Sequence, residues 1–205
     1  MSGFLDKHYA AKTVEEVGEV YDAWAPTYEQ ELQGEYYAGA NSVAQVVIEF
    51  VSDDQASILD IGCGTGLIGQ TLANAGFSNL HGIDLSVGML ESARANNCYL
   101  NLEQVNLLEP LAMPSFSYDV IVSSGVFTNS LLGPEVLDKV LTLVKPGGYA
   151  IIGINSVAFI EQKYDARIRA MIEPRAGEIL ECREMPYWPS KDVSSRVAVI
   201  QLHSA

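Results

Sequence analysis

Positive charge is scarce in this 205-residue chain, which carries 12 lysine and arginine residues against 26 aspartate and glutamate residues. The resulting net charge of −14 makes a surface that repels phosphate backbones and anionic lipid headgroups. Nucleic acid and membrane surfaces are therefore not expected among its partners. An acidic balance is also common in soluble proteins that bind nothing anionic, so it excludes more than it identifies.

Cysteine is also rare. Cys63, Cys98 and Cys182 lie far apart and form no CxxC pair, which argues against a disulfide framework or a metal site. No segment approaches the ~20 apolar residues that a membrane helix needs, and the first residues lack the pattern of a signal peptide. These absences are typical of a reducing compartment, so we expect a cytoplasmic protein without a metal ion.

Apolar residues make up 48% of the chain, which is enough for one substantial core, and no repeat or linker divides it. We predict a single domain over residues 1–205. Its parts are N-terminal helices over 1–52, a cofactor-binding core over 53–154, and a C-terminal helix with edge strands over 155–205.

The pattern of apolar residues predicts the secondary structure. Helical spacing indicates two helices before the first strand, with a polar stretch between them around residues 29–37. Strands and helices then alternate, and the predicted strands span residues 58–61, 80–84, 102–105, 119–123 and 149–154, followed by a helix around 159–171 and strands at 178–185 and 196–202. This order predicts an α/β fold, namely a Rossmann-like, doubly wound, mostly parallel seven-stranded sheet with an antiparallel edge pair.

A glycine-rich corner follows the first predicted strand, with the sequence Asp60-Ile-Gly62-Cys-Gly64-Thr-Gly66. Glycines let the backbone approach a ligand closely, and the N-terminus of the next helix offers free N–H groups. The acid before the first glycine indicates a ligand with a cationic end rather than a bare pyrophosphate.

Polar residues also end the next three strands. Asp84 lies where a carboxylate can accept hydrogen bonds from ribose hydroxyls, and Asn106 lies where an amide can bond an adenine edge. The backbone carbonyl of Ser123 is placed to receive an ammonium group. Because the carboxyl ends of parallel strands share one edge of the sheet, these residues are expected around one crevice.

The corner, Asp84 and the Lys145-Pro-Gly-Gly148 turn resemble the motifs of class I S-adenosylmethionine-dependent methyltransferases, over roughly residues 58–154. The resemblance implies S-adenosyl-L-methionine as the cofactor. The segment from Tyr21 to Glu29 is similar to the lid of small-molecule members, which implies lid aromatics near the reactive methyl group and makes Tyr28 a candidate catalytic residue. The residues expected to bind the cofactor are Tyr21, Trp24, Tyr28, Asp60, Gly62, Cys63, Gly64, Asp84, Leu85, Met89, Asn106, Leu107 and Ser123.

One position departs from the family pattern. Many members carry an acid at the end of the third strand, where this chain has Asn106. An amide oxygen still accepts the hydrogen bond of the adenine amino group, so adenine binding is expected to survive.

These features predict a methyltransferase that acts on a small molecule. No Asn-Pro-Pro-Tyr type run follows the fourth strand, which tells against methylation of adenine or glutamine amino groups in this superfamily. The acceptor pocket is expected from the lid, residues 127–131, residues 155–159 and the Tyr187-Trp188 pair. No histidine lies at a strand's carboxyl end, so none is predicted as a general base, and the enzyme is expected to act mainly by positioning.

Alternatives remain open. Gly64-Thr-Gly-Leu-Ile-Gly69 satisfies GxGxxG, so an NAD-dependent oxidoreductase is a rival. The chain could also be a regulatory or partner protein that binds the cofactor without turnover. Glu29, Glu31 and Glu35 are interpreted as a solvated face, or else as part of a pocket for a cationic amine. The expected assembly is a monomer or homodimer.

Overall fold

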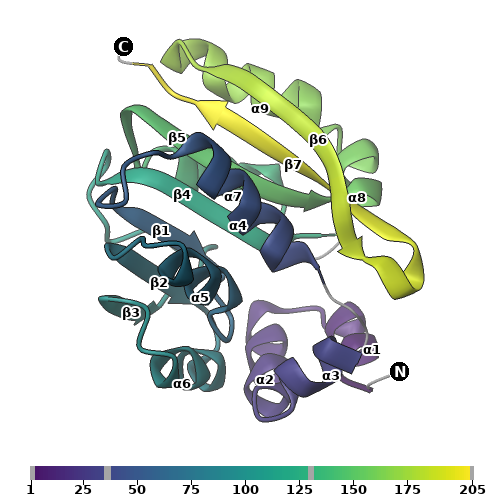
Figure 1. Ribbon diagram of the computed structural model, residues 1–205. Helices are drawn as coiled ribbons and strands as arrows, with labels where there is room; N and C mark the ends of the chain where they lie inside the picture. The colour runs from purple at the N-terminus through teal and green to yellow at the C-terminus, as the bar shows by residue number, and fades with distance from the viewer. Residues whose placement is uncertain (1–2, 35–37, 129–131, 204–205) are drawn as a thin grey trace.

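The computed structural model describes residues 3–34, 38–128 and 132–203. Its centre is a seven-stranded sheet in the order β3-β2-β1-β4-β5-β7-β6 (Figure 1). The strands are β1 (Ile58–Ile61), β2 (Leu80–Asp84), β3 (Asn101–Gln104), β4 (Tyr118–Phe127), β5 (Val144–Asn155), β6 (Glu178–Trp188) and β7 (Val193–Gln201). The first five strands run parallel, and β7 pairs antiparallel with both β5 and β6. The predicted fold class, with its antiparallel edge pair, is confirmed.

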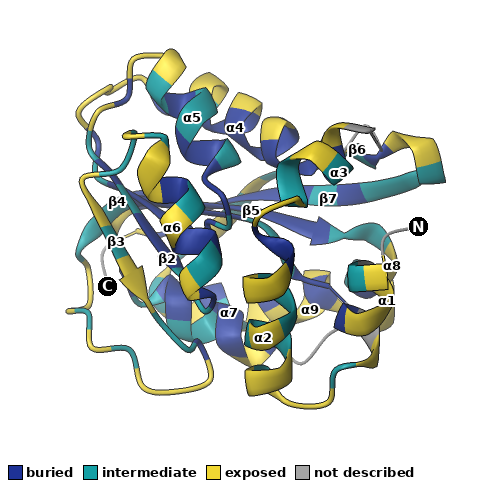
Figure 2. Cartoon of the chain, turned by 90° about the horizontal axis from the view of Figure 1, so that it is seen from below, coloured by how far each residue is buried: buried dark blue, intermediate teal, exposed yellow. Residues whose placement is uncertain are grey.

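Two hydrophobic cores lie on opposite faces of the sheet, because alternate residues of a strand point to opposite sides. On one face, Ile58 and Val122 belong to the core that also holds residues of α4 (Gly39–Phe50) and α5 (Leu67–Asn74). On the other, Leu59 and Ile121 pack with α7 (Pro134–Leu141) and α9 (Tyr164–Ile172). The central strands are accordingly buried, whereas the outer faces of the helices are exposed (Figure 2).

The N-terminal region differs from the prediction of two helices. It contains α1 (Gly3–Ala10), α2 (Val14–Trp24), α3 (Tyr28–Gly34) and α4. Helix α1 has a weak sequence signal and is held instead by tertiary packing, since the Phe4 ring stacks on Trp24 at 5.9 Å between centroids. Helix α3 occupies most of the stretch predicted to be a polar joint, and the Thr27 hydroxyl donates to Glu31 in its first turn. Residues 35–37 of that joint lie outside the described residues.

Three further boundaries need correction. The helix predicted around 159–171 is two helices, α8 (Ser156–Glu161) and α9, because Lys163 between them has a left-handed backbone with φ 54°. The predicted turn from Lys145 to Gly148 is an outward bulge within β5, marked by a register shift against β4 and by φ 82° at Gly147. Strand β4 continues to Phe127, so Ser123 lies inside the strand and not at its end.

Smaller elements complete the chain. Helix α6 (Val87–Ala95) is capped by Ser86, whose hydroxyl accepts from the Met89 N–H at 3.0 Å. Short 3-10 turns span Glu173–Arg175 and Pro189–Lys191. None of the helices in the described part of the chain has the length and hydrophobicity needed to cross a bilayer.

Candidate functional site

A pocket lies between the N-terminal helices and the carboxyl ends of the parallel strands. Helices α1 to α3, which we call the lid, lie beside that edge of the sheet (Figure 1). Ten of the residues predicted to bind the cofactor line this pocket: Tyr21, Trp24, Tyr28, Gly62, Gly64, Asp84, Leu85, Met89, Asn106 and Leu107. The chain therefore brings most of the predicted set together, although the members come from distant parts of the sequence.

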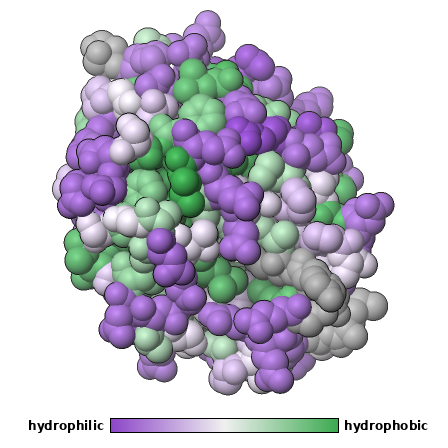
Figure 3. Space-filling model, viewed as in Figure 1, coloured by the Kyte–Doolittle hydropathy of each residue, from purple (hydrophilic) through white to green (hydrophobic). Residues whose placement is uncertain are grey.

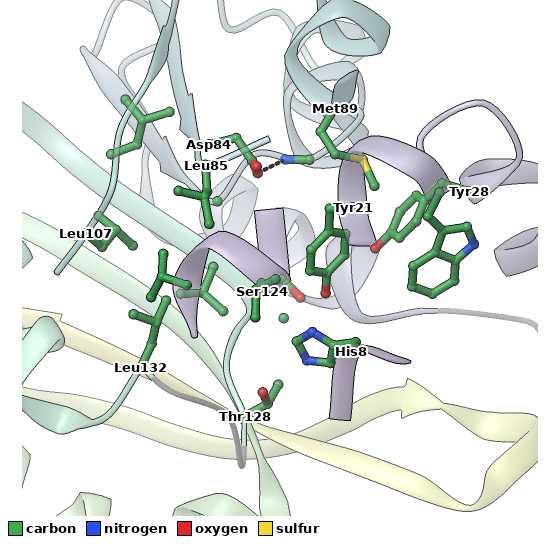
Figure 4. Close-up of a pocket in the computed structure, with 18 of the residues that line it drawn as sticks. His8, Tyr21, Tyr28, Asp84, Leu85, Met89, Leu107, Ser124, Thr128 and Leu132 are labelled. Carbon is green, nitrogen blue, oxygen red and sulfur yellow. Dashed lines mark hydrogen bonds between the residues drawn. The ribbon is translucent and has the colours of Figure 1, made fainter. Parts of the chain in front are cut away.

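Asp84 is held at the end of β2 by the backbone. Its carboxylate accepts hydrogen bonds from the Gly64 N–H at 2.8 Å and the Ser86 N–H at 2.9 Å, and it projects toward the pocket in Figure 4. Burial raises the pKa of Asp84, while the backbone N–H groups act to lower it. Each carboxylate oxygen keeps a lone pair beyond these bonds, so the group can still accept two ligand hydroxyls.

The glycine corner owes its shape to left-handed residues. Gly62 has φ 66° and Gly64 has φ 55°, a region that costs L-residues with a side chain. A Cβ on Gly62 would lie 2.2 Å from a methyl carbon of Val126, whereas nothing lies within 4 Å of one on Gly64. Gly62 is thus required by close packing as well as by its backbone conformation.

Asp60 lies beneath this corner and is almost completely buried. Its Oδ2 accepts a hydrogen bond from the Tyr99 hydroxyl at 2.7 Å, and that hydroxyl accepts the Gly69 N–H at 3.1 Å. Its Oδ1 has no hydrogen-bond partner among the described residues. Burial raises the pKa of Asp60 to about 7, a tendency that the bond from Tyr99 opposes and the nearby Asp84 reinforces. A buried carboxylate oxygen without a partner suits a cationic ligand group.

The third glycine of the GxGxxG match serves a different purpose from the one in a dinucleotide fingerprint. A Cβ on Gly69 would lie 2.3 Å from the Tyr99 ring. Gly69 therefore admits Tyr99 against α5, and Tyr99 in turn holds Asp60. The packing of Tyr99 explains the glycine at position 69 without a bound pyrophosphate. The GxGxxG match is therefore weaker evidence for an NAD-binding site.

The free energy of unfolding of the Asp60→Asn variant is expected to decrease less with rising pH than that of the native protein. An unfolded aspartate ionises near its ordinary pKa of 3.8, whereas the folded one keeps its proton to about 7. The folded state therefore binds more protons in this window, and the native protein loses stability as the pH rises through it. Asparagine cannot ionise, so the stability of Asp60→Asn relative to the native protein should increase by up to about 4 kcal/mol across the window.

Urea unfolding of the ligand-free proteins at the two ends of this pH range measures the difference. Asp53→Asn is the matched control, because Asp53 is an exposed aspartate outside the pocket. Equal pH dependence in Asp60→Asn and the native protein would contradict a buried, protonated Asp60.

Three predicted cofactor contacts are placed elsewhere. Asp60 is beneath the pocket wall and not in it, and the Cys63 sulfur packs near Gly82. The Ser123 hydroxyl donates to the Ile61 carbonyl at 2.9 Å within the sheet. Because β4 extends past Ser123, the wall is formed by Ser124 and the residues after it.

Asn106 does line the pocket at the position predicted for adenine. Its side-chain oxygen accepts the Leu108 N–H at 2.9 Å and so shapes its own loop. One lone pair of that oxygen remains for a ligand donor.

The lid aromatics form one cluster. Tyr21 and Tyr28 flank Trp24, whose ring centroid is 6.0 Å from the former and 4.8 Å from the latter. Trp24 is 3% exposed, so it is mainly a core residue of the lid, whereas the two tyrosines also face the pocket (Figure 4).

Asp22 attaches the lid to the core. Its carboxylate accepts hydrogen bonds from the Ser86 hydroxyl at 2.6 Å and from the Gly88 N–H at 2.9 Å. Both donors belong to the N-terminus of α6, where the helix dipole favours a negative charge. Gly88 packs closely against the backbone of Asp22, since a Cβ on Gly88 would lie 3.1 Å from the Asp22 carbonyl oxygen.

The Asp22→Ala variant is expected to open the lid more often. Loss of the two hydrogen bonds should raise the dissociation rate of S-adenosylhomocysteine about 10-fold, because a lost cap costs about 1 kcal/mol or more. Stopped-flow tryptophan fluorescence measures this rate, since Trp24 lies in the lid. Glu19→Ala, an exposed change on the same helix, is the control and should leave the rate unchanged. An unchanged rate in Asp22→Ala would show that the lid is held by other contacts.

Some site residues were missed from the sequence, and the predicted acceptor segments are only partly present. His8 lines the pocket although no histidine was predicted there, because α1 was not expected. Thr128 and the Tyr187–Trp188 pair line it as predicted, and residues 129–131 lie outside the described residues. The segment 155–159 does not line the pocket; its first residue, Asn155, caps α8 by accepting the Val157 N–H at 3.0 Å.

Comparisons with known proteins agree with this geometry. Residues 59–150 match the model of a methyltransferase domain. The chain is 34% identical to human methyltransferase-like protein 27 over 131 residues, which are 62% of this chain and 53% of that protein. It is 31% identical to EEF1A lysine methyltransferase 2 of Danio rerio over 153 residues, 63% of this chain and 65% of that protein. The crystal structure of the 4+2 cyclase SpnF superposes with a TM-score of 0.71 at 18% identity, covering 95% of this chain and 98% of that one.

Residues 59–150 thus match a methyltransferase domain, and the motifs of this region resemble those of class I S-adenosylmethionine-dependent methyltransferases, whose cofactor is S-adenosylmethionine. The lid segment 21–29 is also similar to that of the Williams–Beuren syndrome region methyltransferase-like protein. The chain spans between about half and two thirds of the two curated relatives described above, 53% and 65% of their lengths.

Proposed function

We propose that this chain transfers the methyl group of S-adenosylmethionine to a small-molecule acceptor. The observation that carries the proposal is a pocket whose cofactor end is formed by the glycine corner and Asp84, and whose other side is formed by the lid. Asp22 ties the lid to the core directly beside Asp84. Such closure excludes water from a reactive methyl group.

The residues present fit the cofactor. Asp84 would accept the two ribose hydroxyls, and Asn106 with Leu107 would border the adenine. The backbone of the glycine corner would border the methionine moiety. When bound, S-adenosylmethionine supplies an electrophilic methyl group on a sulfonium. The chain's own task is then to align the acceptor, for which well-oriented placement is worth ~7–11 kcal/mol.

The scarcity of carboxylates in the pocket wall favours a small acceptor over a lysine side chain of a protein. Asp84 is the only carboxylate among the described lining residues, and it faces the cofactor end. Glu29 and Glu31 are not among the lining residues, so they do not form a binding site for a cationic amine in this pocket. The name of EEF1A lysine methyltransferase 2 makes lysine the competing acceptor class.

Parallel calorimetric titrations with S-adenosylmethionine, S-adenosylhomocysteine and NAD test the cofactor. Micromolar binding of the two sulfur compounds without NAD is expected, and binding of NAD alone would refute the proposal. Formation of S-adenosylhomocysteine with small hydroxyl, amine and thiol compounds, compared with intact EEF1A, then tests the acceptor class. Turnover with EEF1A alone would replace the small-molecule acceptor by a protein.

A second candidate is a protein that binds the cofactor without methyl transfer. The structural neighbour SpnF is described as a cyclase, and a shared fold does not dictate the reaction. On the face shown in Figure 3, hydrophobic side chains lie in small groups between hydrophilic ones. This arrangement tells against a large hydrophobic docking surface for a partner protein on that face. Tight cofactor binding without turnover on any acceptor would favour this candidate. The expected oligomeric state, monomer or homodimer, and cytoplasmic location remain predictions.

A further inference from the structure

His8 faces the side of the pocket opposite Asp84. The side chain is 8% exposed, and its ring packs edge-on against Tyr21 with 5.3 Å between centroids. Figure 4 shows the imidazole in the pocket near Tyr21, Ser124 and Thr128, whereas Asp84 lies on the far side. The cofactor's ribose and the imidazole would therefore occupy opposite ends, with the transferable methyl group between them.

The wall around His8 is apolar except for uncharged polar groups. Leu132 and Trp188 line the pocket together with the hydroxyl of Thr128. No lysine or arginine occurs among the described lining residues, so an anionic acceptor would lack a counter-charge. The single carboxylate among these residues, that of Asp84, belongs to the cofactor end, so a cationic acceptor would also lack a counter-charge.

Resting on the proposed function, we propose that His8 accepts the proton of the methyl acceptor, and that this acceptor is an uncharged, weakly acidic hydroxyl compound of the phenol type. The acceptor oxygen forms a bond to the methyl carbon as the sulfur–methyl bond breaks, with both electrons of that bond passing to sulfur. The hydroxyl proton passes to an imidazole nitrogen of His8 and from there to solvent. The products are a methyl ether and S-adenosylhomocysteine.

The electrostatic surroundings suit a proton acceptor. Burial lowers the pKa of His8, so the imidazole is neutral at neutral pH and one of its ring nitrogens can take up a proton. The titratable groups that share the pocket with it are Tyr21, Tyr28, Tyr187 and Asp84, and its own helix adds Asp6 and Lys7. Burial of the imidazole is the cause of the lowered pKa of His8.

Histidine NMR titration tests the position of His8 without an identified acceptor. The pKa of His8 should be lower in the complex with S-adenosylmethionine than in that with S-adenosylhomocysteine, because only the former carries a positive sulfonium. His81 lies outside the pocket, so its pKa should be the same in both complexes. An equal pKa of His8 in the two complexes would overturn the proposal, whereas failure of both compounds to bind would refute the proposed function instead.

Turnover tests the chemistry, with phenol and catechol as hydroxyl probes and benzylamine as the amine probe. His8→Gln should lower kcat on the hydroxyl probes by about 10²–10⁴-fold, with cofactor affinity unchanged in calorimetry. His8→Ala should regain part of that loss with added imidazole, while His203→Gln should behave as the native protein. Transfer to benzylamine alone would overturn the hydroxyl assignment. Absence of turnover on every probe, with cofactor bound, would count against the proposed transfer itself.

Discussion

The Asp84→Ala variant is expected to lose at least about 100-fold in affinity for S-adenosylmethionine. Its carboxylate would accept two ribose hydroxyls, and hydrogen bonds to a charged acceptor contribute about 1.5–3 kcal/mol each. The change also leaves the N–H groups of Gly64 and Ser86 without their acceptor, which loosens the glycine corner. Isothermal titration calorimetry of native and variant proteins measures the loss.

Two controls separate binding from folding. Asp53→Ala removes an exposed carboxylate outside the pocket and should retain native affinity. Thermal unfolding of Asp84→Ala shows whether the variant is folded at the titration temperature. No single histidine replacement is expected to abolish cofactor binding. Native affinity in a folded Asp84→Ala protein would refute the assignment of the cofactor site.

The Gly62→Ala variant is expected to lose about 2–5 kcal/mol of stability together with most cofactor binding. The left-handed backbone of Gly62 costs an alanine about 1–2 kcal/mol. The added methyl group also meets the Val126 side chain at 2.2 Å, and overpacking of this kind costs about 1–3 kcal/mol. Urea unfolding measures the combined effect.

Gly64→Ala is the matched control within the same turn. Gly64 has a similar φ of 55°, but a Cβ there meets nothing within 4 Å, so only the backbone cost of about 1–2 kcal/mol is expected. Adding Val126→Ala to Gly62→Ala should recover the steric part of the loss and leave the backbone part. Equal losses in Gly62→Ala and Gly64→Ala would show that the close contact with Val126 carries no energetic weight.

The secondary-structure elements that were predicted correctly are those marked by residues close together in the sequence. The strands β1 and β2 are short apolar runs that end at turn residues, and their bounds agree with the prediction. The strands β6 and β7 of the antiparallel edge pair were predicted from such runs as well. Such signals persist in isolation because they depend on backbone conformation and on burial of one face.

Other elements depend on partners far along the chain. Helix α1 has little amphipathic pattern and is held by Phe4 and His8 packing on residues of α2, so no local signal marks it. The extension of β4 beyond Ser123 includes Gly125 with φ 84° and a register shift, which depend on pairing with β5. Both errors of prediction affect the site. His8 was not predicted as a pocket residue, and Ser123 was predicted where Ser124 lines the pocket.

By itself, the sequence determined the class of fold, the glycine corner and the position of Asp84, because each depends on residue types at short spacing. The tertiary structure alone decided which side chains share the pocket, how Asp22 holds the lid on α6, and that Tyr99 supports the buried Asp60. These contacts join residues about 30 or more positions apart, and their geometry follows from packing that no short segment specifies. The chemistry at the acceptor end belongs to this second group, because His8 reaches it only when the lid lies against the core.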